Sequence, residues 1–277
     1  MRAYRVAYDG RPFHGFQRQP DVPTVEDAIF DALRDLDVFG DDADRPDGYA
    51  AAGRTDAGVS ARAQTVAFEG PEWLTPRAFN AELPRAVRAW ASADVPDEFH
   101  ATHDARERTY VYHLYAPREG AVAYAPFDDD CARAALDRLA GKHDFHNLTP
   151  DAEGTVRDLT ANADRDGEFL VVTLSAGGFA RQLVRRVVGL VAEIGFEESD
   201  LDRVERVLGP DPLDGPGGVA PAPAEPLVLW DVDYPGVEFA VDENAAASAR
   251  SVFAESRVAR ATGARVAGSI AGGLDDP

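Results

Sequence analysis

The order of strand-like and helical segments predicts an α+β fold built from two related halves. Residues 2–95 carry the order βαββαβ, which is the ferredoxin-like split βαβ motif, and residues 107–234 carry a similar set. We therefore expect two ferredoxin-like halves, over 1–104 and 105–236, whose mixed or antiparallel sheets flank a central cleft. Residues 237–277 are expected to form a C-terminal extension that is helical and then frayed.

In the first half, alternation marks the first strand and a capping pattern marks the main helix. Residues 2–9 alternate between apolar and polar side chains, as in a strand with one buried face. Thr24 and Asp27 fit the N-cap and third position of a helix, and apolar residues recur at helical spacing from Val25 to Leu36. Further along we expect strands over 48–53 and 62–69, joined by the Arg54–Ser60 loop, then a short helix over 76–83 and a strand over 86–95.

The second half contains a comparable series, followed by an Ala-rich segment. We expect strands over 107–115, 156–163, 168–175 and 227–234, and helices over 131–140, 178–196 and 200–208. Residues 210–226 are rich in Pro and Gly and predict a loop. Residues 242–267 predict a helix, and the last ten residues are expected to fray.

The charge balance of the chain is unusual. Asp and Glu outnumber Lys and Arg by 49 to 28, for a formal net charge of −21, and Lys142 is the single lysine against 27 arginines. An acid excess that retains arginine indicates adaptation to molar salt. Proteins that bind nucleic acid are normally basic, so the net charge alone argues against an RNA partner. At 1 M salt, however, the Debye length is only about 3 Å, and a local arginine cluster can act almost independently of the net charge.

Composition also bears on location and on metal binding. No apolar run approaches the roughly 20 residues of a membrane span, and the alternating N-terminus is unlike a signal peptide, so we expect a cytoplasmic protein. Cys131 is the only cysteine, which rules out an internal disulfide and a Cys-based zinc cluster. The pairs His100/His103 and His143/His146 have a spacing that suits a metal, but no third ligand accompanies them in the sequence, and we expect no metal.

The segment Gly53–Ala61, Gly-Arg-Thr-Asp-Ala-Gly-Val-Ser-Ala, is the strongest candidate for chemistry. As a turn between two predicted strands it can present Asp56 in a cleft, with Arg54 two residues away. An adjacent cation favours the ionised form of an acid, which a nucleophile or a base needs. The residues alone leave a second interpretation open, a surface turn with an Asx-type cap.

The same segment resembles the signature loop of the TruA-type tRNA pseudouridine synthase family, Gly-Arg-Thr-Asp-Ala-Gly-Val-His-Ala. Ser60 stands where that pattern has His, a departure that concerns local loop contacts rather than the carboxylate. Other similar pieces follow in the family's order over residues 4–235, and several ordered motifs are more specific than one. They are Tyr8–Gly10, Gly15–Gln19, the Asn-x-x-Leu-Pro element Asn80–Pro84, the Arg-x-Tyr-x-Tyr strand Arg108–Tyr112 and the helix Phe179–Gly189.

The resemblance implies an enzyme that isomerises uridine to pseudouridine in the anticodon stem-loop of tRNA, at nucleotide positions 38–40, without a cofactor. Asp56 is implied as the catalytic carboxylate, and Arg185 as the arginine that holds it ionised. Tyr110 is implied to pack on the flipped-out base, and Arg54 to hold RNA or the local backbone. The resemblance also implies that the central cleft binds RNA. The family is typically a homodimer whose RNA spans both subunits.

Other interpretations are open for the residues and for the whole chain. Arg185 could be a helix surface charge, although it lies in an apolar run where the adjacent Arg186 could take the exposed position, and Tyr112 is best explained as core. A non-catalytic RNA-binding module or tRNA chaperone could use the same sheets but does not need the Arg-Thr-Asp turn. An Asp-based glycosidase or hydrolase normally uses two carboxylates that flank the bond, and no comparable motif supplies a second acid beside Asp56.

Overall fold

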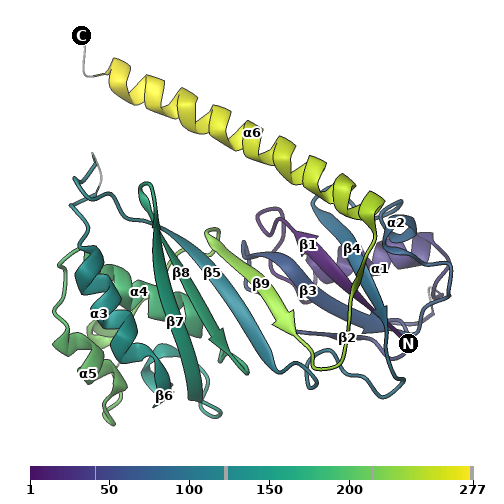
Figure 1. The fold of residues 1–277 in the computed structure, drawn as a ribbon, viewed down its shortest axis with the longest axis horizontal. Helices are drawn as coiled ribbons and strands as arrows, with labels where there is room; N and C mark the ends of the chain where they lie inside the picture. The colour runs from purple at the N-terminus through teal and green to yellow at the C-terminus, as the bar shows by residue number, and fades with distance from the viewer. Residues whose placement is uncertain (41, 122–123, 214, 275–277) are drawn as a thin grey trace.

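One large, mostly antiparallel sheet runs through the molecule (Figure 1). The structure, a computed structural model, describes residues 1–40, 42–121, 124–213 and 215–274. Within these ranges the strand order is β10-β4-β1-β3-β9-β5-β8-β7-β6, and β2 pairs with β3. The strands are β1 (Arg2–Tyr8), β2 (Ala50–Ala51), β3 (Ser60–Phe68), β4 (Val87–Asp94), β5 (Glu107–Tyr115), β6 (Gly141–Asp144), β7 (Val156–Asp166), β8 (Phe169–Ala176), β9 (Leu227–Asp233) and β10 (Ala240–Val241).

The strands of residues 2–94 and those of residues 107–233, called here the first and second half, join in the middle of this sheet. β3 and β9 pair in parallel, with Ser60 opposite Val228 and Ala61 opposite Leu229, whereas their outer neighbours β1 and β5 pair with them antiparallel. The strand order is β4-β1-β3-β2 on one side of this junction and β9-β5-β8-β7 on the other. Because Ser60 is the first residue of β3, the loop that precedes it lies at the junction between the halves.

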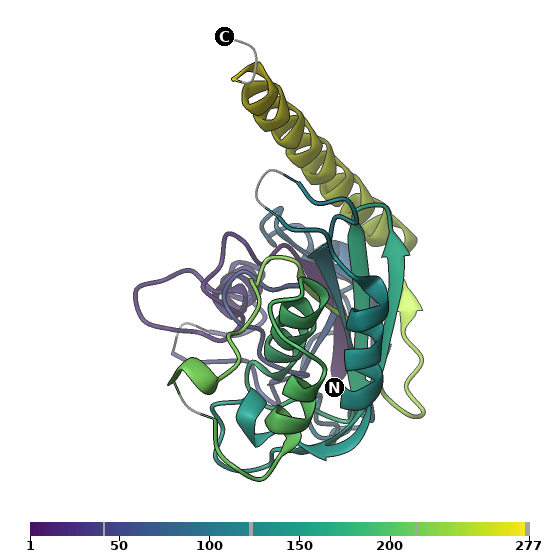
Figure 2. The ribbon, with the colours of Figure 1, turned by 90° about the vertical axis from the view of Figure 1, so that its left-hand side faces the viewer.

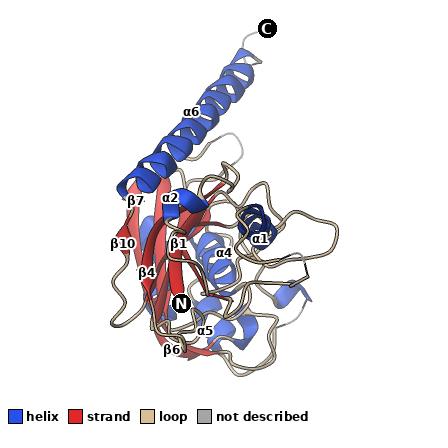
Figure 3. Cartoon of the chain, turned by 90° about the vertical axis from the view of Figure 1, so that its right-hand side faces the viewer, coloured by secondary structure: helices blue, strands red, loops and turns tan. Residues whose placement is uncertain are grey.

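Helices cover one face of the sheet, and Figure 3 shows α1 and α4 on the same side of it. The helices are α1 (Val25–Asp35), α2 (Pro76–Phe79), α3 (Asp129–Leu139), α4 (Leu183–Gly195), α5 (Asp202–Leu208) and α6 (Glu243–Gly273). The predicted cap of α1 is confirmed, because the Thr24 hydroxyl accepts the Asp27 N–H at 3.2 Å. Between the sheet and the helices other than α6 lies the core, in which Tyr4 stacks on Phe68 with 5.1 Å between ring centroids.

The helix expected over 178–196 begins later than predicted. It starts at Leu183, because Gln182 takes a left-handed conformation with φ of 61° and the residues before it form a loop. The Asp151 carboxylate accepts the Arg181 N–H at 2.8 Å and so holds this loop. The loop leads Phe179 back to β5, where its ring meets Tyr110 edge-on.

Two elements of the first half are shorter than the sequence suggests. The strand expected over 48–53 keeps only the two residues of β2, since the carbonyls of Ala52 and Gly53 accept side-chain hydrogen bonds from Arg108 and Gln64. The helix expected over 76–83 ends at Phe79. Directly after it, the Asn80 side chain binds both the N–H and the carbonyl of Ala89, which turns the chain towards β4.

The short strands β6 and β10 were not predicted, and the C-terminal helix is longer than predicted. β6 pairs with β7 and β10 pairs with β4, each over four residues or fewer, too short to leave an alternating pattern in the sequence. α6 has 31 residues and runs to Gly273 instead of ending at 267, so most of the segment expected to fray is helical. Residues 275–277, the end of that segment, lie outside the described residues.

α6 packs on the body of the protein in its first half, and Arg260, further along, forms an ion pair with Asp9. Ala245, Ala246 and Ala249 are buried there, and the helix contacts β4 and α2. Figures 2 and 3 show its second half extending past the rest of the molecule. Among the described residues, no helix combines the length and the apolar character that a membrane span requires.

Candidate active site

Asp56 lies in the loop between β2 and β3, and hydrogen bonds fix this loop from several sides. The Thr55 carbonyl accepts the Phe16 N–H at 3.0 Å, and the Thr55 hydroxyl is 2.8 Å from the hydroxyl of the buried Tyr8. Within the loop, the Val59 N–H donates to the Asp56 carbonyl at 3.1 Å. Asp56 is thus the partly exposed member of a loop whose neighbours on both sides, Thr55 and Val59, are anchored.

Two glycines of the N-terminal motifs allow other backbone segments to approach this loop closely. A Cβ on Gly10 would lie 2.0 Å from the Val59 carbonyl oxygen, so only glycine fits at this position. Gly15 has φ of +104°, a conformation that L side chains rarely adopt, and its backbone passes the Thr55 carbonyl. Ser60 accepts the Gly10 N–H on its Oγ at 3.1 Å. The departure from the resembled pattern at Ser60 therefore preserves a polar anchor for the loop.

The structure brings Asp56 and Arg185 together. Nη1 of Arg185 donates to Oδ2 of Asp56 at 3.0 Å, and Nε of Arg185 donates to the Ala222 carbonyl at 2.7 Å. The Asp56 side chain is 35% exposed and the Arg185 side chain is 17% exposed. Arg186, in contrast, donates to the Val219 carbonyl at 2.6 Å and to Gln182. Arg185 is therefore not a free surface charge, and it is the arginine of this helix that faces the aspartate.

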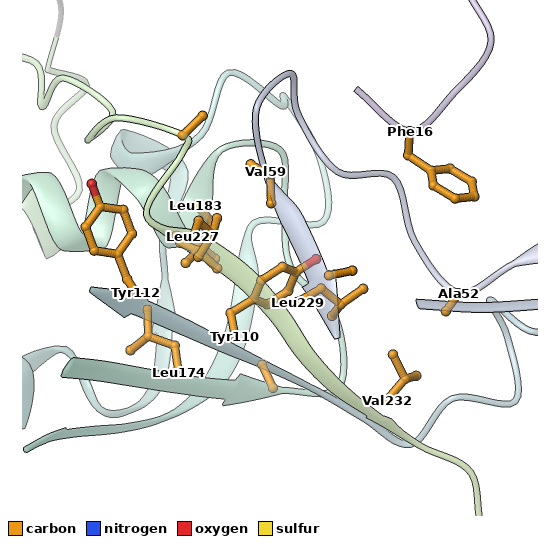
Figure 4. Packing of buried hydrophobic residues seen from close by; sticks show 14 of the residues in the cluster. Phe16, Ala52, Val59, Tyr110, Tyr112, Leu174, Leu183, Leu227, Leu229 and Val232 are labelled. Atoms are coloured by element: carbon orange, nitrogen blue, oxygen red, sulfur yellow. The ribbon is translucent and has the colours of Figure 1, made fainter. Parts of the chain in front are cut away.

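Tyr110 lies beside this ion pair, on β5. Its side chain is largely buried, and its ring meets that of Phe179 edge-on with 5.1 Å between centroids. Burial raises the pKa of Tyr110 to about 12, and the negative charge of Asp56 acts in the same direction. The hydroxyl therefore stays protonated at neutral pH. Figure 4 shows the ring among apolar side chains from both halves, including Val59 and Leu183.

These residues line an open cleft of about 1360 Å³ between the two halves. Its walls come from the loop that follows β1, the start of α1, the Asp56 loop, and the segment that leads into α4. Arg54 is exposed on the wall next to Asp56. Two further arginines on the walls have carboxylate partners, Arg18 with Asp27 at 2.8 Å and Arg181 with Asp151 at 3.4 Å. All four predicted site residues thus border one cleft.

Arg108 is a residue of this region that the sequence did not identify as functional. Its guanidinium is buried and binds only backbone carbonyls in the contacts described: Ala52 at 3.1 and 2.7 Å, Thr102 at 2.7 Å and Gly177 at 2.8 Å. Ala52 precedes the Asp56 loop, and Gly177 begins the loop that carries Phe179. Arg108 therefore ties together the two segments that place Asp56 and the Tyr110 neighbourhood.

The two His pairs with metal-like spacing stand apart from further ligands in the part of the chain that the structure describes. No group of three or more His, Cys, Asp or Glu side chains there is arranged to hold a metal ion. The rings of His100 and His103 lie 4.2 Å apart between centroids, and His146 Nδ1 lies 3.5 Å from the carboxylate of Asp144. Both pairs lack a third ligand.

An arginine-bound aspartate beside a buried, protonated tyrosine, in an open cleft of about 1360 Å³, fits a class of enzymes that act on a base of a nucleic acid. Comparison with known proteins makes this specific. A family model described as tRNA pseudouridine synthase matches residues 135–235. The chain is 60% identical over 275 residues to the tRNA pseudouridine synthase A of Haloarcula marismortui, covering 99% of this chain and 100% of that one.

Two further relatives carry the same name. The protein of Halobacterium salinarum is 60% identical over 270 residues, covering 98% of each chain. The protein of Archaeoglobus fulgidus is 36% identical over 247 residues, which cover 88% of this chain and 87% of that one. The chain belongs to the tRNA pseudouridine synthase A family. It is an enzyme that isomerises uridine to pseudouridine in tRNA, and the prediction of an enzyme over a non-catalytic RNA-binding module is confirmed.

Proposed function

We propose that Asp56 is the catalytic carboxylate of this isomerisation and that Arg185 and Tyr110 complete the reacting centre. The observation that carries the proposal is the 3.0 Å contact between Asp56 Oδ2 and Arg185 Nη1, beside the buried Tyr110 ring. The three side chains come from a loop of the first half, a helix of the second half and the central strand β5. They meet in the cleft, where a substrate can reach the free part of the carboxylate.

The isomerisation requires a positioned carboxylate and no redox partner. The bond between N1 of uracil and C1′ of ribose breaks, the base rotates, and C5 bonds to C1′. N1 gains a proton and C5 loses one, so no oxidant or reductant takes part. Asp56 can act by nucleophilic attack or by removing a proton from the sugar. Either role depends on a fixed carboxylate, and Arg185, itself fixed by the Ala222 carbonyl, supplies that constraint.

Tyr110 and Arg54 are proposed to receive the nucleotide. The target uridine must leave the helical stack to reach a carboxylate in a cleft. An aromatic side chain that packs on a flipped base contributes about 1–3 kcal/mol, and the edge contact with Phe179 holds the Tyr110 ring in one orientation. Arg54 lies two residues from Asp56 on an exposed part of the same loop, which suits contact with a phosphate of that nucleotide.

The proposed target is the anticodon stem-loop of tRNA, at positions 38–40. The cleft of about 1360 Å³ exceeds the roughly 300–1,000 Å³ of ordinary small-molecule pockets, which supports an RNA loop rather than a free nucleoside as substrate. Arg54, which is exposed on the cleft wall, suits a phosphate. We further propose that the protein acts as a homodimer in the cytoplasm. The net charge of −21 supports an organism with molar internal salt.

The same proposal extends to the organisation of the chain. In both halves the first strand lies between the fourth and the third, as the orders β4-β1-β3-β2 and β9-β5-β8-β7 record. This common scheme supports two ferredoxin-like halves over 1–104 and 105–236 that flank the RNA-binding cleft. Residues 237–277 then form a separate extension that consists mainly of α6.

An assay with unmodified tRNA tests the proposed target. The protein is incubated with a transcribed tRNA that has uridines at positions 38–40, and pseudouridine is mapped by carbodiimide treatment and primer extension. We expect stops at these positions, and none with a matched tRNA that has cytidines there. Modification that is unchanged in the cytidine tRNA, at uridines elsewhere, would contradict the anticodon stem-loop as target without affecting the assignment to the family.

A further inference from the structure

Two ion pairs connect α6 to the body of the protein beyond the buried start of the helix. The first half of α6 packs on β4 (Figure 1). Further along, Glu255 pairs with Arg85, which lies shortly before β4. Arg260 pairs with Asp9, the residue that follows β1. Ser256, four residues before Arg260 and so on the same side of the helix, is half-buried. Arg260 therefore extends the side of α6 that faces the body by one further turn.

The Arg260–Asp9 pair is partly protected from water. The Asp9 side chain is 17% exposed, compared with 78% for the Asp94 side chain in its pair with Arg2. Salt screens partly buried pairs much less than exposed ones. The contact between Arg260 and Asp9 is therefore one that high salt weakens little.

The two residues that flank Asp9 hold opposite ends of the loop between β2 and β3. On one side, the Tyr8 hydroxyl lies 2.8 Å from the Thr55 hydroxyl. On the other side, the Gly10 N–H donates to Oγ of Ser60 at 3.1 Å. Asp9 thus lies between the two residues that anchor this loop to the end of β1.

Gly10 is also packed directly against the loop. A Cβ at Gly10 would lie 2.0 Å from the Val59 carbonyl oxygen, so the two backbones are in contact. The Val59 N–H in turn donates to the Asp56 carbonyl at 3.1 Å. Because close-packed segments have no free space between them, a shift of Gly10 towards the loop must be accompanied by a shift of Val59. The position of Asp56 is therefore coupled to that of the segment that follows Asp9.

α6 contacts this support from outside the active-site cleft. Phe253 and Arg260 line a groove of about 490 Å³ together with Asp9 and Ser60. Among the described residues, none of α6 lines the cleft that contains Asp56. Arg260 is thus separated from a uridine bound beside Asp56, and an effect of Arg260 on turnover has to pass through Asp9.

We propose that Arg260 is a positioning residue for the isomerisation: through Asp9 it holds the end of β1 against the loop between β2 and β3 and so keeps Asp56 in place. This inference rests on the proposed catalytic role of Asp56 and adds to it a function for α6. The pair shifts the balance between a placed and a displaced loop by up to about fivefold, the equivalent of the roughly 1 kcal/mol upper value for an ion pair with exposed members. Since a displacement of about 1 Å in an active site can cost about 10²-fold in rate, the loss appears in turnover before it appears in the fold.

Charge reversal at Arg260 tests the inference in the full-length chain. Arg260→Glu places a carboxylate beside Asp9, so that attraction becomes repulsion. The matched control, Arg265→Glu, makes the same change in net charge on the same helix, at an exposed residue. Single-turnover formation of pseudouridine is measured at saturating enzyme, well below the melting temperature. We expect the rate to fall about fivefold or more in Arg260→Glu only, with equal tRNA dissociation constants for the two variants.

Hydrogen exchange reports on the loop itself. Backbone amides exchange through local opening, and the Val59 amide is bonded to the Asp56 carbonyl. We expect peptides that cover residues 54–60 to exchange faster in Arg260→Glu than in Arg265→Glu. Arg260→Lys, which keeps the cation, should resemble the wild type in both exchange and rate. A role of Arg260 in stability alone predicts a lower melting temperature with wild-type turnover in the folded protein, and that result would overturn the inference.

The Asp56→Asn variant, measured in the same assay, separates failure of the inference from failure of the proposed function. A wild-type rate in Arg260→Glu, an equal loss in the Arg265→Glu control, or unchanged exchange of the loop would each overturn the inference. If Asp56→Asn is inactive and Arg260→Glu is fully active, only the positioning role of Arg260 is wrong. If Asp56→Asn keeps wild-type activity, the proposed function is wrong and the inference fails with it.

Discussion

Arg185 and Asp56 lie 129 positions apart in the chain, yet Nη1 of the arginine and Oδ2 of the aspartate are 3.0 Å apart. Asp56 belongs to the loop before β3 in the first half, and Arg185 to the first turn of α4 in the second half. Partly exposed ion pairs contribute only about 0–1 kcal/mol to stability. The contact therefore adds little to the stability of the fold, and in the proposed function its part is to orient the carboxylate in the cleft.

Replacement of Asp56 by asparagine should remove turnover and leave RNA binding. Asp56→Asn keeps the shape of the side chain and removes its charge, and affinity for tRNA comes mainly from phosphate contacts. We expect less than about one tenth of wild-type pseudouridine formation, with a tRNA dissociation constant within about a factor of three of the wild-type value, since one exposed charge interaction is worth only about 0–1 kcal/mol. Single-turnover kinetics and filter binding measure the two quantities. Activity above one tenth of wild type would remove Asp56 from the catalytic role.

Arg185 should be required for turnover but not for folding. Arg185→Leu removes the Asp56 contact, and loss of one preorganised donor in an active site typically costs about 10²–10³ in kcat. Arg185→Lys should also be poor, because lysine lacks the fork that reaches Asp56 and the Ala222 carbonyl together. The control is Arg186→Leu, on the same helix but bonded to Val219. If Arg185→Leu turns over as fast as this control while both melt normally, Arg185 is not part of the reacting centre.

Tyr110 should act through its ring. Tyr110→Phe keeps the surface that packs on a base, whereas Tyr110→Ala loses it, so tRNA binding should weaken by about 1–3 kcal/mol in the alanine variant only. Tyr112→Phe serves as control, since that hydroxyl binds the Pro223 carbonyl at 3.0 Å in the protein interior. Equal effects of Phe and Ala on both binding and turnover would speak against stacking. A loss of turnover in Tyr110→Phe that is as large as in Tyr110→Ala would point to the hydroxyl instead.

The Asp56 loop and Arg185 could be predicted from the sequence, because the residue types themselves mark these positions. The Gly-Arg-Thr-Asp turn and the arginine in the apolar run of α4 are both visible in the sequence, and the structure brings them together. The capping residues Thr24 and Asp27 likewise announce α1. Local sequence patterns and the spacing of apolar residues are enough to predict an element when its own side chains determine it.

Features held by distant backbone atoms could not be anticipated. Arg108 binds the carbonyls of Ala52, Thr102 and Gly177, and a carbonyl has no residue-specific signature in a sequence. The late start of α4 depends on the left-handed conformation of Gln182, which the surrounding loop imposes on a residue that normally accepts a helix. β2 is short for the same reason. The Ala52 carbonyl accepts hydrogen bonds from the Arg108 side chain and is not used to extend the pairing between strands.

Arg108 should influence catalysis by positioning rather than by contact with RNA. Arg108→Gln leaves the Ala52 and Gly177 carbonyls without their common donor, so the Asp56 loop and the Phe179 loop lose their link. We expect kcat to fall by about tenfold or more, the cost of a displaced reacting group, with KM for tRNA nearly unchanged, and Arg108→Lys to recover part of kcat. The amount of folded protein is determined by circular dichroism. A purely structural role predicts that activity merely follows the folded fraction.

Salt should stabilise the fold and sustain activity. With a net charge of −21, carboxylates at low ionic strength repel one another and destabilise the compact state. Raising KCl from about 0.1 to 2 M shortens the Debye length from about 10 Å to below 3 Å and suppresses this repulsion. Exposed ion pairs such as Arg2 with Asp94 weaken as well, but each is worth only about 0–1 kcal/mol. We therefore expect the melting temperature to rise steeply over this range.

Binding of tRNA sets the opposing trend, and its magnitude decides the outcome. Screening reduces the repulsion between the acidic protein and the RNA, but an enzyme that relies on six or more phosphate contacts loses about 10³ or more in affinity between 50 and 200 mM salt. Stacking on Tyr110 and shape fit are less sensitive to salt, so we expect activity to follow stability upward in the same KCl series. A flat or falling melting temperature would refute adaptation to salt. A rising melting temperature with activity that collapses above about 0.2 M would instead show that phosphate contacts dominate binding.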